Sequence, residues 1–136
     1  MNNNALPDVP FAGHDRFIAA VDQAVAAGDE HAVTAALRSA LCGLIRDPSI
    51  ELPDCVYETI DDHYARREIY RSPEHGYSVV AMTWAPGQGT PIHDHDGAWC
   101  TEIVWHGRLA ITRYAPTERD GERWRLDELG TSEVHP

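Results

Sequence analysis

The chain has 136 residues, of which 22 are acidic and 11 are basic, so its formal net charge is -11 at pH 7. This excess of negative charge argues against binding to a nucleic acid backbone or to an anionic membrane surface, because both partners select basic patches. The length and the 43% hydrophobic content predict one globular domain over residues 1–136, acting on a small molecule. No apolar run reaches the roughly 20 residues of a membrane helix, and no secretory signal starts the chain, which predicts a cytoplasmic protein.

Two helices are predicted at about residues 15–47. Their apolar positions are Phe17, Ile18, Val21 and Val25, then Val33, Leu37, Leu41, Leu44 and Ile45. Asp29 is the expected N-cap of the second helix, and Pro48 ends it because proline cannot continue the hydrogen-bond ladder. Cys42 falls in the second helix, and we expect it to be buried, as free cysteines usually are.

Residues 55–136 are predicted to be rich in β-strands. The runs that favour strands are CVYETI, ARREIYRS, YSVVAMTWA, TEIVWHGRLAITRYA and RWRLDEL, with turn signals at SPEHG and RDGE. Short strands joined by turns predict an antiparallel sandwich or barrel of the jelly-roll kind, with the helices on one side. A bend crowded with glycine and proline at residues 86–91 is expected to deliver His93 onto the next strand.

His93 and His95 are the first candidate site residues. In an extended strand both side chains point to one side, while Asp94 points to the other. Two such imidazoles can bind iron, nickel, copper or zinc. The same spacing also fits two histidines that only form hydrogen bonds, so these two residues alone leave both interpretations open.

The wider pattern resembles the first metal-binding motif of the cupin superfamily. It consists of Gly87, five residues, His93-x-His95, four residues, Cys100, six residues and Gly107. Cys100 stands where many cupins have a glutamate ligand, and WAPGQGTPIHDHDGAWC is similar to the bacterial type of the cysteine dioxygenase family. The resemblance extends over roughly residues 50–130 and implies a mostly β, incomplete cupin-like jelly-roll preceded by two N-terminal α-helices.

The resemblance implies a thiol dioxygenase that oxidises L-cysteine with O2 to cysteine sulfinic acid at a mononuclear non-haem Fe(2+). His93 and His95 would be two of three histidine ligands. The segment YARREIYRSPEHGYSVVAMTW is similar to the part of the family that carries the substrate-binding arginine. Arg66 would bind the substrate carboxylate through its planar guanidinium, with Tyr64 beside it on the same strand face and the adjacent Arg67 facing solvent. Arg66 favours cysteine over 3-mercaptopropionate, since relatives with glutamine at this place prefer thiols without the amino group.

Cys100 is expected to line the cavity. In mammalian-type relatives the cysteine at this place is cross-linked to a distant tyrosine, but Tyr114 follows too closely for that role. Glu102 shares the strand face of Cys100 and is a rival metal ligand. The third histidine of the family comes from a later motif that His135 does not match, so we expect either a truncated piece of a longer dioxygenase, with its C-terminal strands missing, or a shortened relative with a defective site.

Alternatives from other classes stay open. One is another metal-dependent cupin enzyme, using nickel, manganese or zinc with Glu102 as a ligand, and a second is a thiol dioxygenase for 3-mercaptopropionate. A third is a non-catalytic cupin-like module, or an inactive fragment, that binds a small carboxylate through Arg66.

Overall fold

The computed structural model describes residues 5–136, and the chain divides into two compact units, Met1–Thr101 and Glu102–Pro136. The first unit holds α1 (His14–Val25), α2 (Glu30–Ile45), the 3-10 helix η1 (Asp54–Tyr57), β1 (Ala65–Arg71) and β2 (Ser78–Thr83), and the second holds β3 (Leu109–Asp120) and β4 (Arg123–Val134). Each pair of strands forms a two-stranded antiparallel sheet. In the described part of the chain, no helix combines the length and apolarity that crossing a bilayer requires.

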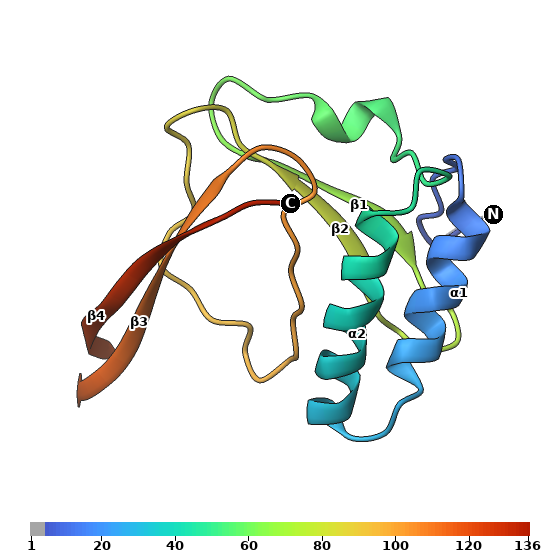
Figure 1. Ribbon diagram of the computed structural model, residues 1–136. Coiled ribbons are helices and arrows are strands. Elements are labelled where there is room, and N and C mark those ends of the chain that lie inside the picture. The colour runs from blue at the N-terminus through green and yellow to red at the C-terminus, as the bar shows by residue number, and fades with distance from the viewer. Residues whose placement is uncertain (1–4) are drawn as a thin grey trace. The chain divides into compact units, whose positions relative to one another are not determined.

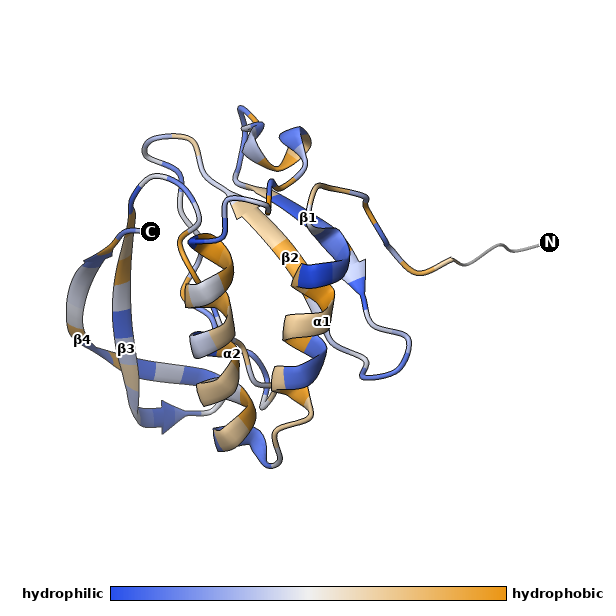
Figure 2. Cartoon of the chain, turned by 45° about the vertical axis from the view of Figure 1, so that its right-hand side comes forward, coloured by the Kyte–Doolittle hydropathy of each residue, from blue (hydrophilic) through white to orange (hydrophobic). Residues whose placement is uncertain are grey.

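The two predicted helices are confirmed. The Asp29 carboxylate accepts a hydrogen bond of 2.9 Å from the Ala32 backbone N–H, so it caps α2 as expected. Figure 1 shows α1 and α2 side by side against the sheet of β1 and β2, and Figure 2 shows hydrophobic segments on both helices. The core of the first unit consists of Phe17, Ile18, Val21, Ala24, Val33, Leu37, Leu44, Ile50, Val56, Ala65, Ile69 and Tyr77.

Gly13 is the N-cap residue of α1, and the segment with Ser49 and Ile50 passes close to its backbone. Its φ is 78°, and a Cβ added there would lie 2.8 Å from the Ser49 carbonyl oxygen and 2.8 Å from Ile50 Cγ1. The Glu51 N–H donates to the Ala12 carbonyl at 3.0 Å, which holds the two segments together. A side chain at position 13 is therefore excluded both by conformation and by space.

The N-terminal segment covers one edge of β1. The Val9 N–H donates to the Ile69 carbonyl at 2.8 Å, and the Arg71 N–H donates to the Pro7 carbonyl at 2.9 Å. His14, at the start of α1, contacts Asp8 of this segment through Nε2 at 2.6 Å. These contacts pair the backbone groups that an edge strand would otherwise expose.

Several predictions for the first unit are wrong. CVYETI does not form a strand, because Pro53 precedes a helical turn in which the Val56 N–H donates to the Pro53 carbonyl at 3.0 Å. His93 does not lie on a strand, since no strand is assigned between Thr83 and Leu109. Cys42 is exposed rather than buried, because the buried face of α2 is formed by Val33, Leu37 and Leu44 and position 42 points away from it.

The second unit is a long hairpin that turns at Gly121 (φ 61°), as the RDGE signal predicts. β3 begins only at Leu109, so the first part of the run TEIVWHGRLAITRYA is not in a strand. The strand pairing is irregular between Pro116 and Glu118, where proline provides no N–H for the ladder. Helices followed by antiparallel strands are consistent with a small cupin-like fold, whereas the jelly-roll and the single domain stay predictions.

Candidate metal centre

The loop after β2 begins with a sharp turn that anchors it to the first unit. The Gln88 N–H donates to the Ala85 carbonyl at 3.0 Å, and Gly87, following Pro86, has φ 85°, as in a type II turn. The Gln88 side chain closes the turn, since its Oε1 accepts from the Ala85 N–H at 2.8 Å and its Nε2 donates to the Ile60 carbonyl at 2.6 Å. The predicted bend is therefore present, and it holds the start of the loop that carries both histidines.

A second turn follows His95 directly. The Ala98 N–H donates to the His95 carbonyl at 3.0 Å, and the two residues between them, Asp96 and Gly97, have φ 51° and 78°. Positive φ at both central positions is typical of a type I′ turn, for which Asp-Gly is a preferred pair. The turn reverses the chain and returns Cys100 toward His95. The Asp-Gly dipeptide is a sequence signal that the strand-based prediction missed.

The imidazoles of His93 and His95 lie close together, with ring centroids 5.5 Å apart and ring planes at 83°. His93 Nδ1 lies 2.8 Å from the Pro91 carbonyl oxygen. Because a carbonyl only accepts, Nδ1 carries the hydrogen in the neutral ring, which leaves the lone pair of Nε2 for a metal. The Asp94 carboxylate instead accepts from the Asp96 N–H at 3.1 Å, within the turn. Two imidazole donors therefore meet here without a strand to align them.

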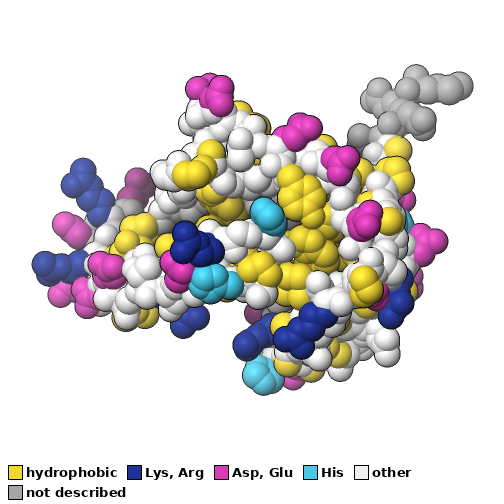
Figure 3. Space-filling model, turned by 45° about the horizontal axis from the view of Figure 1, so that its top comes forward, with side chains coloured by type: hydrophobic (Ala, Val, Ile, Leu, Met, Phe, Trp, Pro, Cys, Tyr) yellow, Lys and Arg dark blue, Asp and Glu magenta, His cyan; other side chains and the backbone are white. Residues whose placement is uncertain are grey.

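Cys100 and Glu102 add further donors beside His95. One ligand atom from each of these three residues lies within 4.8 Å of the others, and all three residues are exposed. Only one residue separates Cys100 from Glu102, so local sequence and the Asp-Gly turn account for this group. His93 is not a member of it. On the face drawn in Figure 3, histidine side chains (cyan) reach the molecular surface.

Arg66 and Tyr64 lie together on the sheet. Arg66 pairs with Met82 across the β1–β2 ladder and is exposed. Tyr64, one residue before β1, packs its ring 5.8 Å from that of Trp84, one residue after β2. Residues two apart share a strand face, so Tyr64 and Arg66 are on one side of the ladder, as expected. A guanidinium can bind a carboxylate through two parallel N–H donors.

Arg67 does not face solvent, contrary to expectation. Its Nη2 donates to the Glu58 carbonyl at 2.7 Å, and its Nη1 is buried without a hydrogen-bond partner among residues 5–136. Of the two adjacent arginines, Arg66 is the exposed one, because Arg67 shares the face of the buried Ala65. Arg67 therefore ties the segment after η1 to the sheet, and Arg66 keeps its guanidinium accessible.

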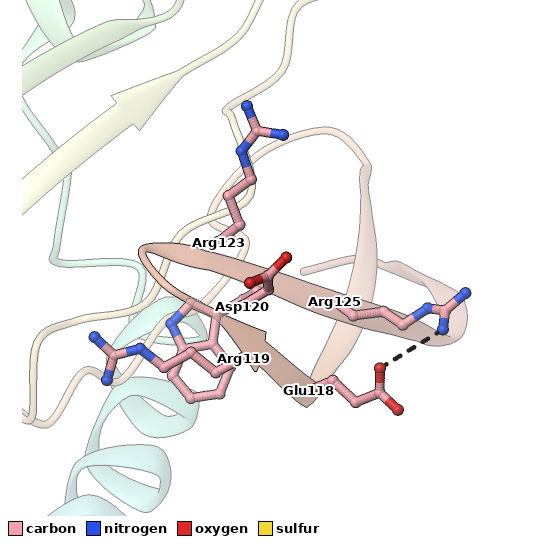
Figure 4. Close-up of a pocket in the computed structure, with 6 residues that line it drawn as sticks. Glu118, Arg119, Asp120, Arg123 and Arg125 are labelled. Carbon is pink, nitrogen blue, oxygen red and sulfur yellow. Dashed lines mark ion pairs between the residues drawn. The ribbon is translucent and has the colours of Figure 1, made fainter.

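A hollow at the tip of the β3–β4 hairpin has a different character. Its lining comprises Glu118, Arg119, Asp120, Arg123, Trp124 and Arg125. Figure 4 shows these side chains, with the ion pair between Glu118 and Arg125, whose atoms lie 3.8 Å apart. Arg119 lies over the Trp124 ring at 5.5 Å. This hollow is open and contains no histidine or cysteine, so we do not place the metal centre there.

Comparison with known proteins shows that the chain matches one protein family. The family model described as "Cysteine dioxygenase type I" matches residues 53–134, more than half of the chain. The matched part contains β1, β2, the loop with both histidines and β3. No solved structure matches the chain.

Proposed function

Because the chain belongs to the cysteine dioxygenase type I family, we propose that it is an iron-dependent dioxygenase that converts L-cysteine and O2 to cysteine sulfinic acid. The observation that carries this proposal is the pair of imidazoles, 5.5 Å apart, within the family motif. The donor chemistry fits Fe(2+), since imidazole is a suitable ligand for iron and, in the neutral His93 ring, the hydrogen bond of Nδ1 to the Pro91 carbonyl leaves the lone pair of Nε2 for the metal. His93 and His95 would supply two ligands of the ion.

In this proposal the residues of the chain hold and orient the substrate. When bound, iron supplies the chemistry that transfers both oxygen atoms of O2 to the thiol sulfur. Arg66 binds the substrate carboxylate through two parallel N–H donors, which fixes the rotation of the amino acid as well as its position. The Tyr64 ring packs 5.8 Å from that of Trp84, and its hydroxyl would form a hydrogen bond to the same substrate.

The first experiment measures oxygen consumption by the purified chain, loaded anaerobically with Fe(2+), when L-cysteine is added. Turnover is expected for the unmodified chain and should be lost in a His93→Ala, His95→Ala double variant. A His31→Ala variant is the matched control, because His31 is an exposed histidine of α2. Turnover that persists in the double variant would overturn the assignment of the ligands.

Substrate choice tests Arg66 separately. Arg66→Gln should raise KM for cysteine by about 10–100-fold, because hydrogen bonds to a charged group contribute roughly 1.5–3 kcal/mol. The variant should lose less activity toward 3-mercaptopropionate if Arg66 determines the preference for cysteine. Equal losses with both thiols would contradict the proposed role, and Arg16→Gln, which changes an exposed arginine of α1, is the control.

Glu102 favours a second candidate, a cupin enzyme that uses nickel, manganese or zinc. Its carboxylate belongs to the group with His95 and Cys100, and carboxylates are good ligands for manganese. Activity measured with each metal in turn separates the two candidate functions, since only the cysteine dioxygenase requires iron. In either case we propose a cytoplasmic protein that acts on small molecules, without a nucleic acid or membrane partner, in line with the net charge of -11.

A further inference from the structure

The carboxylate of Glu68 is bound by two side chains of the β1–β2 sheet. Arg71 donates to it twice, from Nε to Oε1 at 2.7 Å and from Nη2 to Oε2 at 3.0 Å, and the Ser78 hydroxyl donates to Oε1 at 2.6 Å. The hydrogen bonds from Arg71 and then from Ser78 hold the pKa of Glu68 below its usual range, so the carboxylate is negatively charged at neutral pH. Both of its oxygens therefore have fixed partners.

A β-bulge in β1 brings these side chains together. The strand pairing shifts by one residue between Glu68 and Tyr70, so Ile69 is an extra residue in β1. In a regular strand, residues three apart face opposite sides of the sheet. The extra residue turns Arg71 to the side of Glu68, where it also lies directly opposite Ser78 on β2. The bulge therefore aims the side chain of Arg71 at the Glu68 carboxylate.

Arg66 lies on the same side of β1, two residues before Glu68. Residues two apart in a strand are separated by about 6.6 Å, which the long side chains of arginine and glutamate can span. The positive charge of Arg66 contributes to the lowered pKa of Glu68. Among residues 5–136, however, Arg66 forms no ion pair. Its guanidinium stays unoccupied while the neighbouring carboxylate is engaged by Arg71.

We propose that Arg71 and Ser78 are positioning residues that restrain the Glu68 carboxylate. Their hydrogen bonds keep Glu68 away from Arg66, whose guanidinium thereby stays available to the carboxylate of a substrate. A released Glu68 would compete with the substrate for the same N–H donors. Exposed ion pairs are weak, so this competition should lower the availability of Arg66 about two- to fivefold. The restraint on Glu68 is independent of the proposed function, whereas its benefit to substrate binding rests on it.

Chemical labelling of Arg66 tests the restraint in the metal-free chain. Phenylglyoxal reacts with guanidine groups, and an arginine paired with a carboxylate reacts more slowly because the ion pair favours the charged form. Mass spectrometry of peptides follows Arg66 separately from Arg67. Arg71→Gln should slow the labelling of Arg66 about two- to fivefold. Unchanged labelling in Arg71→Gln would overturn the proposal.

A double-mutant cycle separates this effect from the simple loss of a positive charge. Once Glu68→Gln is present, adding Arg71→Gln should leave the labelling of Arg66 unchanged, because no carboxylate remains to be released. Equal slowing in both backgrounds would mean that the charge of Arg71 acts directly on Arg66, and it would refute the proposal. Arg38→Gln, which removes an exposed charge of α2, is the matched control and should have no effect.

Ser78 is tested in the variant that already lacks the arginine. Adding Ser78→Ala to Arg71→Gln removes the last of the three hydrogen bonds to Glu68, so it should slow the labelling of Arg66 further. The same rate with and without Ser78→Ala would exclude Ser78 from the restraint. Far-ultraviolet circular dichroism of each variant verifies that it is folded.

Oxygen consumption separates this inference from the proposed function. In an active chain, Arg71→Gln should raise KM for cysteine about two- to fivefold with little change in kcat, and the rise should disappear in the Glu68→Gln background. The expected labelling without any oxygen consumption would support the restraint on Glu68 and contradict the dioxygenase. Oxygen consumption with a KM for cysteine that Arg71→Gln leaves unchanged would contradict the benefit to substrate binding.

Discussion

Replacing one glycine with alanine should have opposite effects at Gly13 and at Gly43. Gly13 has φ 78°, where an L side chain costs about 1–2 kcal/mol. A Cβ there would also lie 2.8 Å from the Ser49 carbonyl oxygen, and relieving such a contact costs about 1–3 kcal/mol. Gly13→Ala should therefore lower the free energy of unfolding by about 2–5 kcal/mol.

Gly43 is the matched control within the same unit. It lies inside α2, and an added Cβ would meet nothing within 4 Å. Gly43→Ala should raise the free energy of unfolding by about 0.5–1 kcal/mol, because alanine loses less backbone entropy in a helix. Urea unfolding followed by far-ultraviolet circular dichroism measures both variants. Equal stability of the two variants would refute the reasoning about residues 13, 49 and 50.

Asp29→Ala should lower the free energy of unfolding by about 1 kcal/mol, because the N–H of Ala32 loses its acceptor, and urea unfolding would show no change if the cap contributed nothing. Hydrogen bonds to Asp15 and then to Asp8 raise the pKa of His14 above its usual 6.5, although burial opposes them. The resulting stabilisation is fully present below about pH 6.5 and is lost as the pH rises through the higher folded pKa, so urea midpoints should fall over that range. His14→Gln should remove that fall, and an unchanged pH profile in this variant would exclude His14 as its source.

The sequence was sufficient to predict the helices and strands that depend on local patterns of residues. Apolar spacing predicts both helices, and Asp29 marks the start of α2 because its side chain can satisfy a helix N–H. β1 and β2 are predicted from runs of β-branched and aromatic residues, and side-chain alternation puts Arg66 on the same face as Tyr64, one residue before β1. The spacing of glycine, histidine and cysteine in the family motif indicates His93 and His95 as metal ligands, which stays a prediction.

Features that depend on tertiary contacts could not be predicted from these local patterns. The proximity of His93 and His95 was expected from strand alternation, whereas it arises in a loop that two turns shape. The exposure of Cys42 depends on which face of α2 packs, and a nearly continuous apolar sequence does not specify that face. The reversed exposure of Arg66 and Arg67 depends on a carbonyl that only the folded chain brings near.

Tyr77 makes the integrity of the first unit visible to absorption spectroscopy. Its hydroxyl donates to the Asp22 carboxylate at 2.6 Å, which joins α1 to a residue 55 positions later in the chain. Burial and this carboxylate hold the pKa of Tyr77 well above its usual range. Separation of α1 from Tyr77 should therefore lower this pKa toward its usual range, so in alkaline solution the ultraviolet absorption of the Tyr77 phenolate should increase as this unit opens.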